Sequence, residues 1–308
     1  MVFYANGNCI TGIAPDGTKV RQCQDDEKVP AFAENVDVKI TEKCSVGCPF
    51  CYENCTPAGK HADLDSYGFI DHLHPHTEMS INGNDMDHPQ LESFLARLKK
   101  QNVYCNITVN QKQFIDNFEK ICTYQSMGFI SGIGVSFNHY DKEFIDRFLS
   151  VKHGVMHVIA GIVTEDELKQ LTGYNISLLV LGFKERGRGE QFMESSDGCV
   201  EARIRNLHGI LPNLLGSDEF RCICFDNLAL SQLSIREMVS DDKWEKFYMG
   251  DDGSFTFYID LVNGKFARNS IANRKLIIGK RNIDEMFAAI QRIMNYKKKN
   301  NNIKLWQH

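Results

Sequence analysis

The sequence predicts an α/β fold with a parallel sheet at its core. Two observations predict it. From residue 36 onward, short apolar runs alternate with stretches of helical length. The 308 residues are 43% hydrophobic and 24% charged, which is ordinary for a globular chain with a sizeable core. Strands that alternate with helices form βαβ units, and right-handed crossovers then curl the sheet toward a barrel.

The elements follow in chain order. Expected strands cover 36–40, 78–81, 103–109, 134–137, 157–160 and 177–181, and expected helices cover 89–101, 111–126, 141–150, 165–172 and about 200–214. Past residue 217 we expect a strand at 221–225, a strand at 254–262 that pairs with the segment after the Asn263-Gly264 turn, and a helix at 283–296. The expected organisation is a turn-rich lead-in over 1–35, a barrel-like unit over 36–216, and an extension over 217–308 that covers or completes it.

The charge and the cysteine content limit the binding partners and the cellular compartment that we expect. The net charge is −5, so nothing in the bulk electrostatics favours nucleic acid or an anionic membrane. No apolar run approaches the ~20 residues that span a bilayer, and the start lacks the pattern of a signal peptide. The 11 cysteines are odd in number and dispersed. We therefore expect a cytoplasmic protein, in which clustered cysteines are metal ligands or catalysts before they are disulfides.

One cysteine cluster has a specific spacing. Cys44, Cys48 and Cys51 form Cys-x3-Cys-x2-Cys directly after the first expected strand. Three thiolates on one loop can hold three irons of a 4Fe–4S cube and leave the fourth iron open to a small ligand. We expect Gly47 to let this loop turn where a Cβ would collide. The alternative is a zinc site that recruits Cys55 as a fourth thiolate; otherwise Cys55 is a small buried residue.

The segment, with Phe50 before the last cysteine, resembles the signature of the radical S-adenosylmethionine (SAM) superfamily. The resemblance implies that SAM chelates the open iron and is cleaved reductively to a 5′-deoxyadenosyl radical, which abstracts hydrogen from a substrate. It also implies a partial (β/α)6 TIM-like barrel, here with a C-terminal α+β extension, and an electron donor such as flavodoxin or ferredoxin.

The same resemblance implies roles for residues beyond the cysteines. Asn82, Gly83, Asn84 and Asp85 take the place of a Gly-Gly-Glu segment beside the methionine amino group, although the glycine pair is only partly kept. Ser136 and Asn138 fall where the SAM ribose is held, and Gly161 falls where the adenine packs. For these polar positions an ordinary turn or a satisfied loop entry is the alternative.

Catalytic candidates are weaker. Cys199 is a lone thiol that could donate hydrogen, and Asp226 follows a strand and could point at substrate. Cys222 and Cys224 could bind a second cluster, but no further cysteine pattern follows, so we expect one cluster. The basic loop over 182–189 is either an anion clamp or an exposed turn.

Two classes of function follow. The first is a radical SAM enzyme that acts on a peptide or protein, or on a small metabolite or nucleotide. The second is a non-enzymatic zinc or iron–sulfur binding module, in which the three cysteines matter for folding only.

Overall fold

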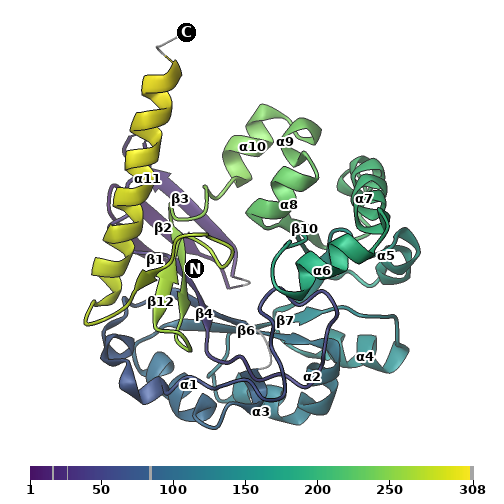
Figure 1. Ribbon diagram of the computed structural model, residues 1–308, viewed down its shortest axis with the longest axis horizontal. Helices are drawn as coiled ribbons and strands as arrows, with labels where there is room; N and C mark the ends of the chain where they lie inside the picture. Colours follow the sequence, from purple (N-terminus) through teal and green to yellow (C-terminus); the bar gives the residue numbers. More distant parts are fainter. Residues whose placement is uncertain (16, 26, 83–84, 306–308) are drawn as a thin grey trace.

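The computed structural model describes residues 1–15, 17–25, 27–82 and 85–305. Its strands form two sheets (Figure 1). The small sheet is antiparallel, with the order β1 (Val2–Asn6), β2 (Cys9–Ile13) and β3 (Lys19–Cys23). The large sheet has ten strands and holds the remaining strand residues.

The large sheet is mostly parallel. Its order is β10 (Cys222–Phe225), β9 (Ser177–Leu181), β8 (Gly154–Ile159), β7 (Gly132–Ser136), β6 (Tyr104–Asn110), β5 (Glu78–Asn82), β4 (Asn35–Lys39), β11 (Thr256–Asp260), β12 (Lys265–Ala267) and β13 (Leu276–Ile277). Every pair from β10 to β11 is parallel, and β12 and β13 add antiparallel. The predicted α/β fold with a parallel sheet is confirmed, and so is the hairpin after Asn263-Gly264.

The strand order determines where the helices lie. Strands β4 to β10 are neighbours in chain order, so right-handed crossovers place the connecting helices on one face of the sheet. Figure 1 shows α1 to α4 along the same side of the strands. The helices are α1 (Leu91–Lys100), α2 (Gln111–Asp116), α3 (Phe118–Ser126), α4 (Lys142–Ser150), α5 (Glu165–Leu171), α6 (Arg188–Ser195), α7 (Cys199–Leu215), α8 (Asn227–Gln232), α9 (Ile235–Met238), α10 (Asp241–Phe247) and α11 (Ile283–Leu305).

The central strands are apolar on one face only. Alternate residues of β4 and β5, such as Val36, Val38 and Ile81, are fully buried in the core under the helices. The residues between them are polar and only half buried. A parallel sheet covered on both faces has near-continuous apolar strands, so this alternation marks a second face that is not packed against a helix layer. That second face forms the wall of the candidate site.

Several local expectations are corrected. The lead-in over 1–35 is not merely turn-rich, because it contains the small antiparallel sheet. Cys9 and Cys23 lie opposite each other in that sheet and form a disulfide, which the sequence reasoning missed by considering metal ligation first. The expected helix over 111–126 is two helices that meet at Asn117, and α6 was not expected.

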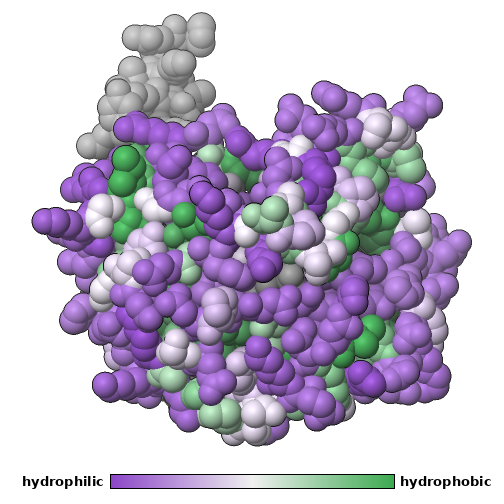
Figure 2. All heavy atoms as spheres, turned by 60° about the horizontal axis from the view of Figure 1, so that its bottom comes forward, coloured by the Kyte–Doolittle hydropathy of each residue, from purple (hydrophilic) through white to green (hydrophobic). Residues whose placement is uncertain are grey.

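The structure bears in part on the expected partial barrel and on the expected absence of a membrane-spanning segment. The strand order runs from β10 to β13 without pairing these edges, and the curvature of a partial barrel stays a prediction. Within the described residues, no helix combines the length and apolar character needed to cross a membrane. On the face shown in Figure 2, hydrophilic side chains predominate and apolar ones form scattered patches.

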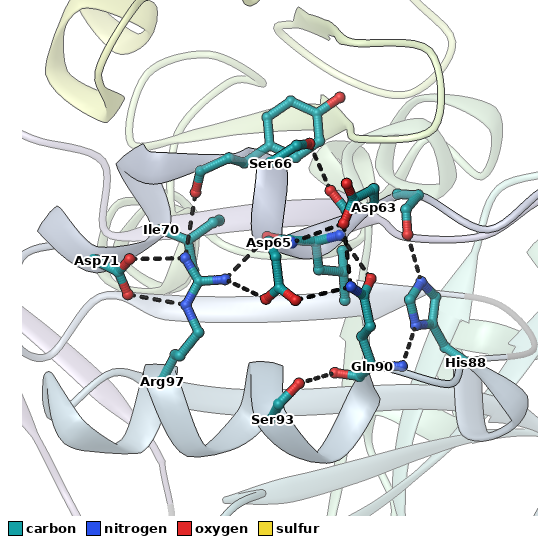
Figure 3. A network of polar contacts seen from close by, with 12 residues as sticks. Asp63, Asp65, Ser66, Ile70, Asp71, His88, Gln90, Ser93 and Arg97 are labelled. Atoms are coloured by element: carbon teal, nitrogen blue, oxygen red, sulfur yellow. Dashed lines mark hydrogen bonds and ion pairs between the residues drawn. The ribbon is translucent and has the colours of Figure 1, made fainter.

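A polar network fastens the first 3-10 turns to α1 (Figure 3). Arg97 binds Asp71 with two hydrogen bonds of 2.9 and 2.8 Å and also donates to the Leu64 carbonyl at 3.0 Å. The Gln90 amide donates to both Asp63 and Asp65. Every labelled carboxylate of this network therefore has a donor, and the connection from η1 (Leu64–Ser66) and η2 (Gly68–His72) to α1 is fixed.

Candidate active site

A large cavity lies against the polar face of the sheet. Its volume is about 1290 Å³, which exceeds the range of about 300–1,000 Å³ usual for one small-molecule pocket. The polar positions of β4 to β8 form one wall, and the loop with the cysteine motif forms another. Toward the amino ends of the strands, Met1, Val2 and Ile13 of the small sheet also line it.

The cysteine loop leaves the carboxyl end of β4 and is pinned at several points. Thr41 and Lys43 form isolated bridges with His61 and Thr56. The Cys44 amide donates to the Thr56 carbonyl at 2.9 Å. Gly47 has a φ of 71°, which favours glycine, but a Cβ there would meet nothing within 4 Å. The expected conformational reason for Gly47 holds, whereas the expected collision does not occur.

Arg188 fastens this loop to the start of α6. Its guanidinium donates to the Cys48 carbonyl and to the Cys55 carbonyl, each at 3.0 Å, and its amide donates to the Cys51 carbonyl at 3.1 Å. Next to it, Phe50 contacts Phe192 of α6 edge-to-face, with ring centroids 5.8 Å apart. The basic loop over 182–189 is thus not a plain exposed turn, because Arg188 braces the cysteine loop, and the anion clamp stays a prediction.

The three motif cysteines are half buried and line the cavity. Burial raises the pKa of the Cys48 thiol, and the neighbouring Cys51 and Cys44 raise it further. A hydrogen bond from Cys55 lowers the pKa of Cys51 to about 6, and Arg188 contributes in the same direction. A lowered pKa favours the thiolate, which is the form that binds metal.

Asparagines at two strand ends lie beside the cysteines. Asn110, the last residue of β6, directs its side-chain amide toward the Cys48 sulfur at 3.9 Å. Asn110 and Asn138 also exchange two hydrogen bonds of 3.1 Å. Ser136 ends β7 next to Asn110 in the sheet register, and it lines the cavity with both asparagines. The structure therefore brings Ser136 and Asn138 to the cysteine loop through Asn110.

The other predicted cofactor residues differ in their placement. Asn82 ends β5 and lines the cavity. Gly83 and Asn84 lie outside the described residues, and Asp85 begins the turn η3 (Asp85–Asp87). Gly161 is packed beneath α7, where a Cβ would come within 2.6 Å of Val200, and its neighbour Ile162 reaches the cavity instead.

Of the two catalytic candidates, Asp226 lines the cavity and Cys199 does not. Asp226 lines the cavity, but its carboxylate caps α8 by accepting from the Ala229 amide at 2.8 Å, and it accepts from the Gly182 amide at 2.9 Å. Cys199 is exposed at the start of α7, away from the residues that line the cavity. Cys222 and Cys224 are exposed on the edge strand β10, where the Cys224 thiol donates a hydrogen bond to Cys222 and its pKa is raised as a result.

Sequence reasoning missed several polar residues that face the cavity. They are Asp37 and Lys39 of β4, Glu78 of β5, Asn106 of β6 and His157 of β8. The alternation of polar and apolar residues within parallel strands was the available signal. His157 is buried, one of its ring nitrogens has no partner, and burial lowers its pKa to about 4, so it stays neutral at physiological pH.

Among the described residues, no three His, Cys, Asp or Glu side chains converge closely enough to hold a single metal ion. The cysteine ligands therefore stay a prediction, supported by their shared loop and cavity.

Comparisons with known proteins give similarity at the level of fold. No protein-family model matches this chain, and no curated protein matches it. Among solved structures, Streptococcus suis SuiB bound to S-adenosylmethionine aligns with a TM-score of 0.55 at 11% identity, over 85% of this chain and 68% of that chain. SuiB bound to its precursor peptide SuiA gives 0.53 at 11% identity, over 84% and 65% of the two chains. SuiB alone gives 0.54 at 12% identity, over 84% and 66%.

These values show a shared α/β fold. The chain spans about two thirds of the length of the SuiB chains that it matches. SAM and SuiA are bound by SuiB in those structures, and their relevance to this chain is a matter of proposal.

Proposed function

We propose that this chain is a radical SAM enzyme in which Cys44, Cys48 and Cys51 hold a 4Fe–4S cluster and SAM occupies its open iron. The observation that carries the proposal is the placement of the three thiols. They stand on one loop at the carboxyl end of a parallel strand, and they open into a cavity large enough for SAM and a second molecule. The fold shared with SAM-binding SuiB supports it.

The donor set fits such a cluster. All three cysteines line the same cavity, and the loop around them is braced by Arg188 rather than by the thiols. Cys55, the fourth thiol required by the zinc alternative, also lines the cavity and donates a hydrogen bond to Cys51, so the metal bound by the reconstituted chain distinguishes the two alternatives. The proposed fold is a partial barrel over 36–216, with 217–308 extending the sheet through β11 to β13.

The residues of this chain would position and shield the reaction. When bound, the cluster and SAM supply a one-electron cleavage that yields methionine and a 5′-deoxyadenosyl radical. Asn110 donates toward the Cys48 sulfur, a contact of the kind that tunes a cluster, and it orients Asn138. Phe50 and Phe192 form an apolar wall beside the loop that excludes water. His157 lines the same cavity and is held neutral by burial, so it adds no charge to the wall.

The proposed substrate is a peptide in the first instance, because the SuiB fold binds the precursor peptide SuiA. A small metabolite is the second class. A reduced flavodoxin or ferredoxin is the proposed electron donor, and the proposed compartment is the cytoplasm.

The test is anaerobic reconstitution with iron and sulfide, followed by measurement of 5′-deoxyadenosine released from SAM after reduction with dithionite. We expect release by the native chain and none by Cys51→Ala. Cys122→Ala, which removes a half-buried thiol of the outer helix α3, is the matched control and should retain release. A colourless protein that binds stoichiometric zinc and releases no 5′-deoxyadenosine would support the binding-module alternative instead.

A further inference from the structure

A cluster of polar side chains from distant segments gathers on one wall of the cavity. Its members come from β4, from the cysteine loop and from the segments that follow β9, β10 and β12, and they all line the cavity: Asp37, Tyr52, Lys184, Asp226 and Ser270. The Asp37 carboxylate differs from the rest. It accepts no hydrogen bond and forms no ion pair within the part of the chain that the structure describes.

The donors closest in register to Asp37 are already committed. Ser80 and Tyr258 lie opposite Asp37 on the two flanking strands. The Ser80 hydroxyl donates to Asn35 at 3.4 Å, and the Tyr258 hydroxyl donates to Glu53 at 3.1 Å. Neither hydroxyl proton is left for the Asp37 carboxylate.

Lys184, the cation whose charge acts on Asp37, also has other partners. The Lys184 ammonium donates to Ser270 at 3.2 Å and lies 4.1 Å from the centre of the Tyr52 ring. It forms no ion pair of 4.0 Å or less with Asp37. Asp226 is satisfied by two backbone amides. The wall therefore has a carboxylate that faces the cavity with all its acceptor capacity unused.

A second carboxylate in the same cavity provides the contrast. Glu78, on the neighbouring strand β5, pairs with Lys19 at 2.8 Å and accepts from Asn106 at 2.6 Å. Glu78 thus has the ion pair and hydrogen bond expected of a structural carboxylate, whereas Asp37 has neither. A carboxylate without partners in a partly desolvated site is costly, and a cationic ligand that enters the cavity removes that cost.

The position of Asp37 separates it from the proposed SAM residues. Asp37 is aligned with Ser80 and Asn106, whereas Asn82 lies two residues further along β5, and Asn110 and Ser136 lie four residues further along the sheet register. At about 3.3 Å per residue these offsets place Asp37 about 7 and 13 Å nearer the amino ends of the strands than the proposed SAM residues. The cavity volume leaves room for a second molecule at that depth.

We propose that Asp37 binds a primary ammonium group of the substrate, so that the substrate class is an amine-bearing molecule. This inference deepens the proposed function and rests on it for the identity of the cavity as the substrate site. Burial raises the pKa of Asp37 to about 6, with Lys184 opposing and Asp252, Glu78 and Asp226 adding to the rise. The carboxylate is consequently ionised at pH 7.5 and available to an ammonium group.

The test is direct binding by calorimetry at pH 7.5 on the anaerobically reconstituted full chain, which requires no SAM cleavage. Three amine probes are used: a doubly capped Ala-Lys-Ala peptide, an Ala-Ala-Ala amide with a free amino terminus, and 1,5-diaminopentane. A doubly capped Ala-norleucine-Ala peptide is the neutral reference. We expect at least one amine to bind about tenfold more tightly than the reference, as a charge-assisted hydrogen bond allows, and Asp37→Asn to abolish the difference.

The probes also distinguish the source of the amine. Preference for the lysine peptide indicates a peptide side chain, preference for the free terminus indicates a peptide end, and preference for the diamine indicates a small metabolite. Glu78→Gln, which alters a paired carboxylate of the same cavity, should keep the amine preference. Asp37→Glu retains the charge and should keep it as well, which guards against a folding defect in Asp37→Asn.

Two results would overturn the inference. One is equal affinity for amine and neutral probes in the native chain. The other is displacement of the amine by SAM together with weaker SAM binding by Asp37→Asn, because Asp37 would then belong to the SAM site. A native chain that shows no amine preference but releases 5′-deoxyadenosine rejects this inference alone. A native chain that shows the amine preference but releases no 5′-deoxyadenosine rejects the proposed function.

Discussion

Two polar regions on opposite faces of the sheet differ in how completely their charges are paired. In the network of Figure 3, Arg97 donates two hydrogen bonds to Asp71, and the Gln90 amide donates to Asp63 and Asp65. Each carboxylate therefore has a donor. On the cavity wall, Asp37 has none. The outer network is partly exposed to solvent, which makes its pairing inexpensive.

The difference distinguishes polar side chains that are paired within the fold from polar side chains that are available to a ligand. Even inside the cavity, Lys39 and Glu78 are paired, whereas the Asp37 carboxylate is left without a partner among the described side chains. Unused polar atoms that face a cavity indicate ligand contacts. The predictions below test this separation.

The largest effect is expected at Lys39, whose ammonium pairs with Glu42 and Glu53 at 2.8 Å and with Asp260 at 3.5 Å. Lys39→Met leaves three carboxylates without their cation, of which Asp260 is buried and Glu42 and Glu53 are partly buried, and should lower the free energy of unfolding by about 3–5 kcal/mol. Urea denaturation measures it. Lys112→Met removes an exposed pair with Asp116 and should leave stability nearly unchanged. Similar small losses in both variants would contradict the structural role of Lys39.

A smaller loss is expected at Arg188, which bridges the Cys48 and Cys55 carbonyls. Arg188→Met leaves both carbonyls without this donor and should cost about 2–3 kcal/mol. It should also lower the iron bound per chain after reconstitution, because the cysteine loop loses its brace. Arg203→Met, which frees one carbonyl at Ile162, is the control for iron content. Full iron loading of Arg188→Met would show that the brace is dispensable.

Asp37→Asn should act in the opposite direction. The pKa of Asp37 is raised from 3.8 to about 6 by folding, so the native state binds more protons than the unfolded state between these values. The free energy of unfolding therefore falls as pH rises through this window, by about 1–3 kcal/mol once solvent in the cavity is considered. Asp37→Asn should match the native chain near pH 4 and exceed its stability above pH 6. Parallel stability curves from pH 4 to 8 would refute this.

The smallest effect is expected in the outer network. Arg97→Ala removes a bidentate contact with a half-exposed carboxylate and should cost about 1 kcal/mol. Its effect on amine binding in the cavity should be nil, which calorimetry checks. Arg147→Ala, which breaks an exposed contact with Glu143 on α4, should cost less still. A loss of several kcal/mol in Arg97→Ala would show that the two regions are not separable as described.

The strands and the cysteine loop could be predicted because their signals are local. The runs at 36–40 and 177–181 are apolar or alternating, and they coincide with β4 and β9 within a residue at each end. The spacing of Cys44, Cys48 and Cys51 is likewise a local pattern, and the structure directs all three to one cavity.

The missed features depend on pairing between distant segments. The contact of Asn110 with Cys48 spans 62 residues, and Arg188 reaches the cysteine loop across 140. No spacing within a short window encodes such contacts. Asp37 was read as an ordinary strand residue, since its lack of a partner is visible only when Ser80, Tyr258 and Lys184 are placed around it.

The central claim is that three thiolates hold a cluster with one iron open to SAM. The most direct measurement is the electron paramagnetic resonance spectrum of the anaerobically reconstituted, dithionite-reduced chain with and without SAM. We predict one 4Fe–4S cluster per chain whose spectrum changes when SAM is added, and no such signal from Cys51→Ala. A spectrum that SAM leaves unchanged, or a cluster that survives in Cys51→Ala, would contradict the account.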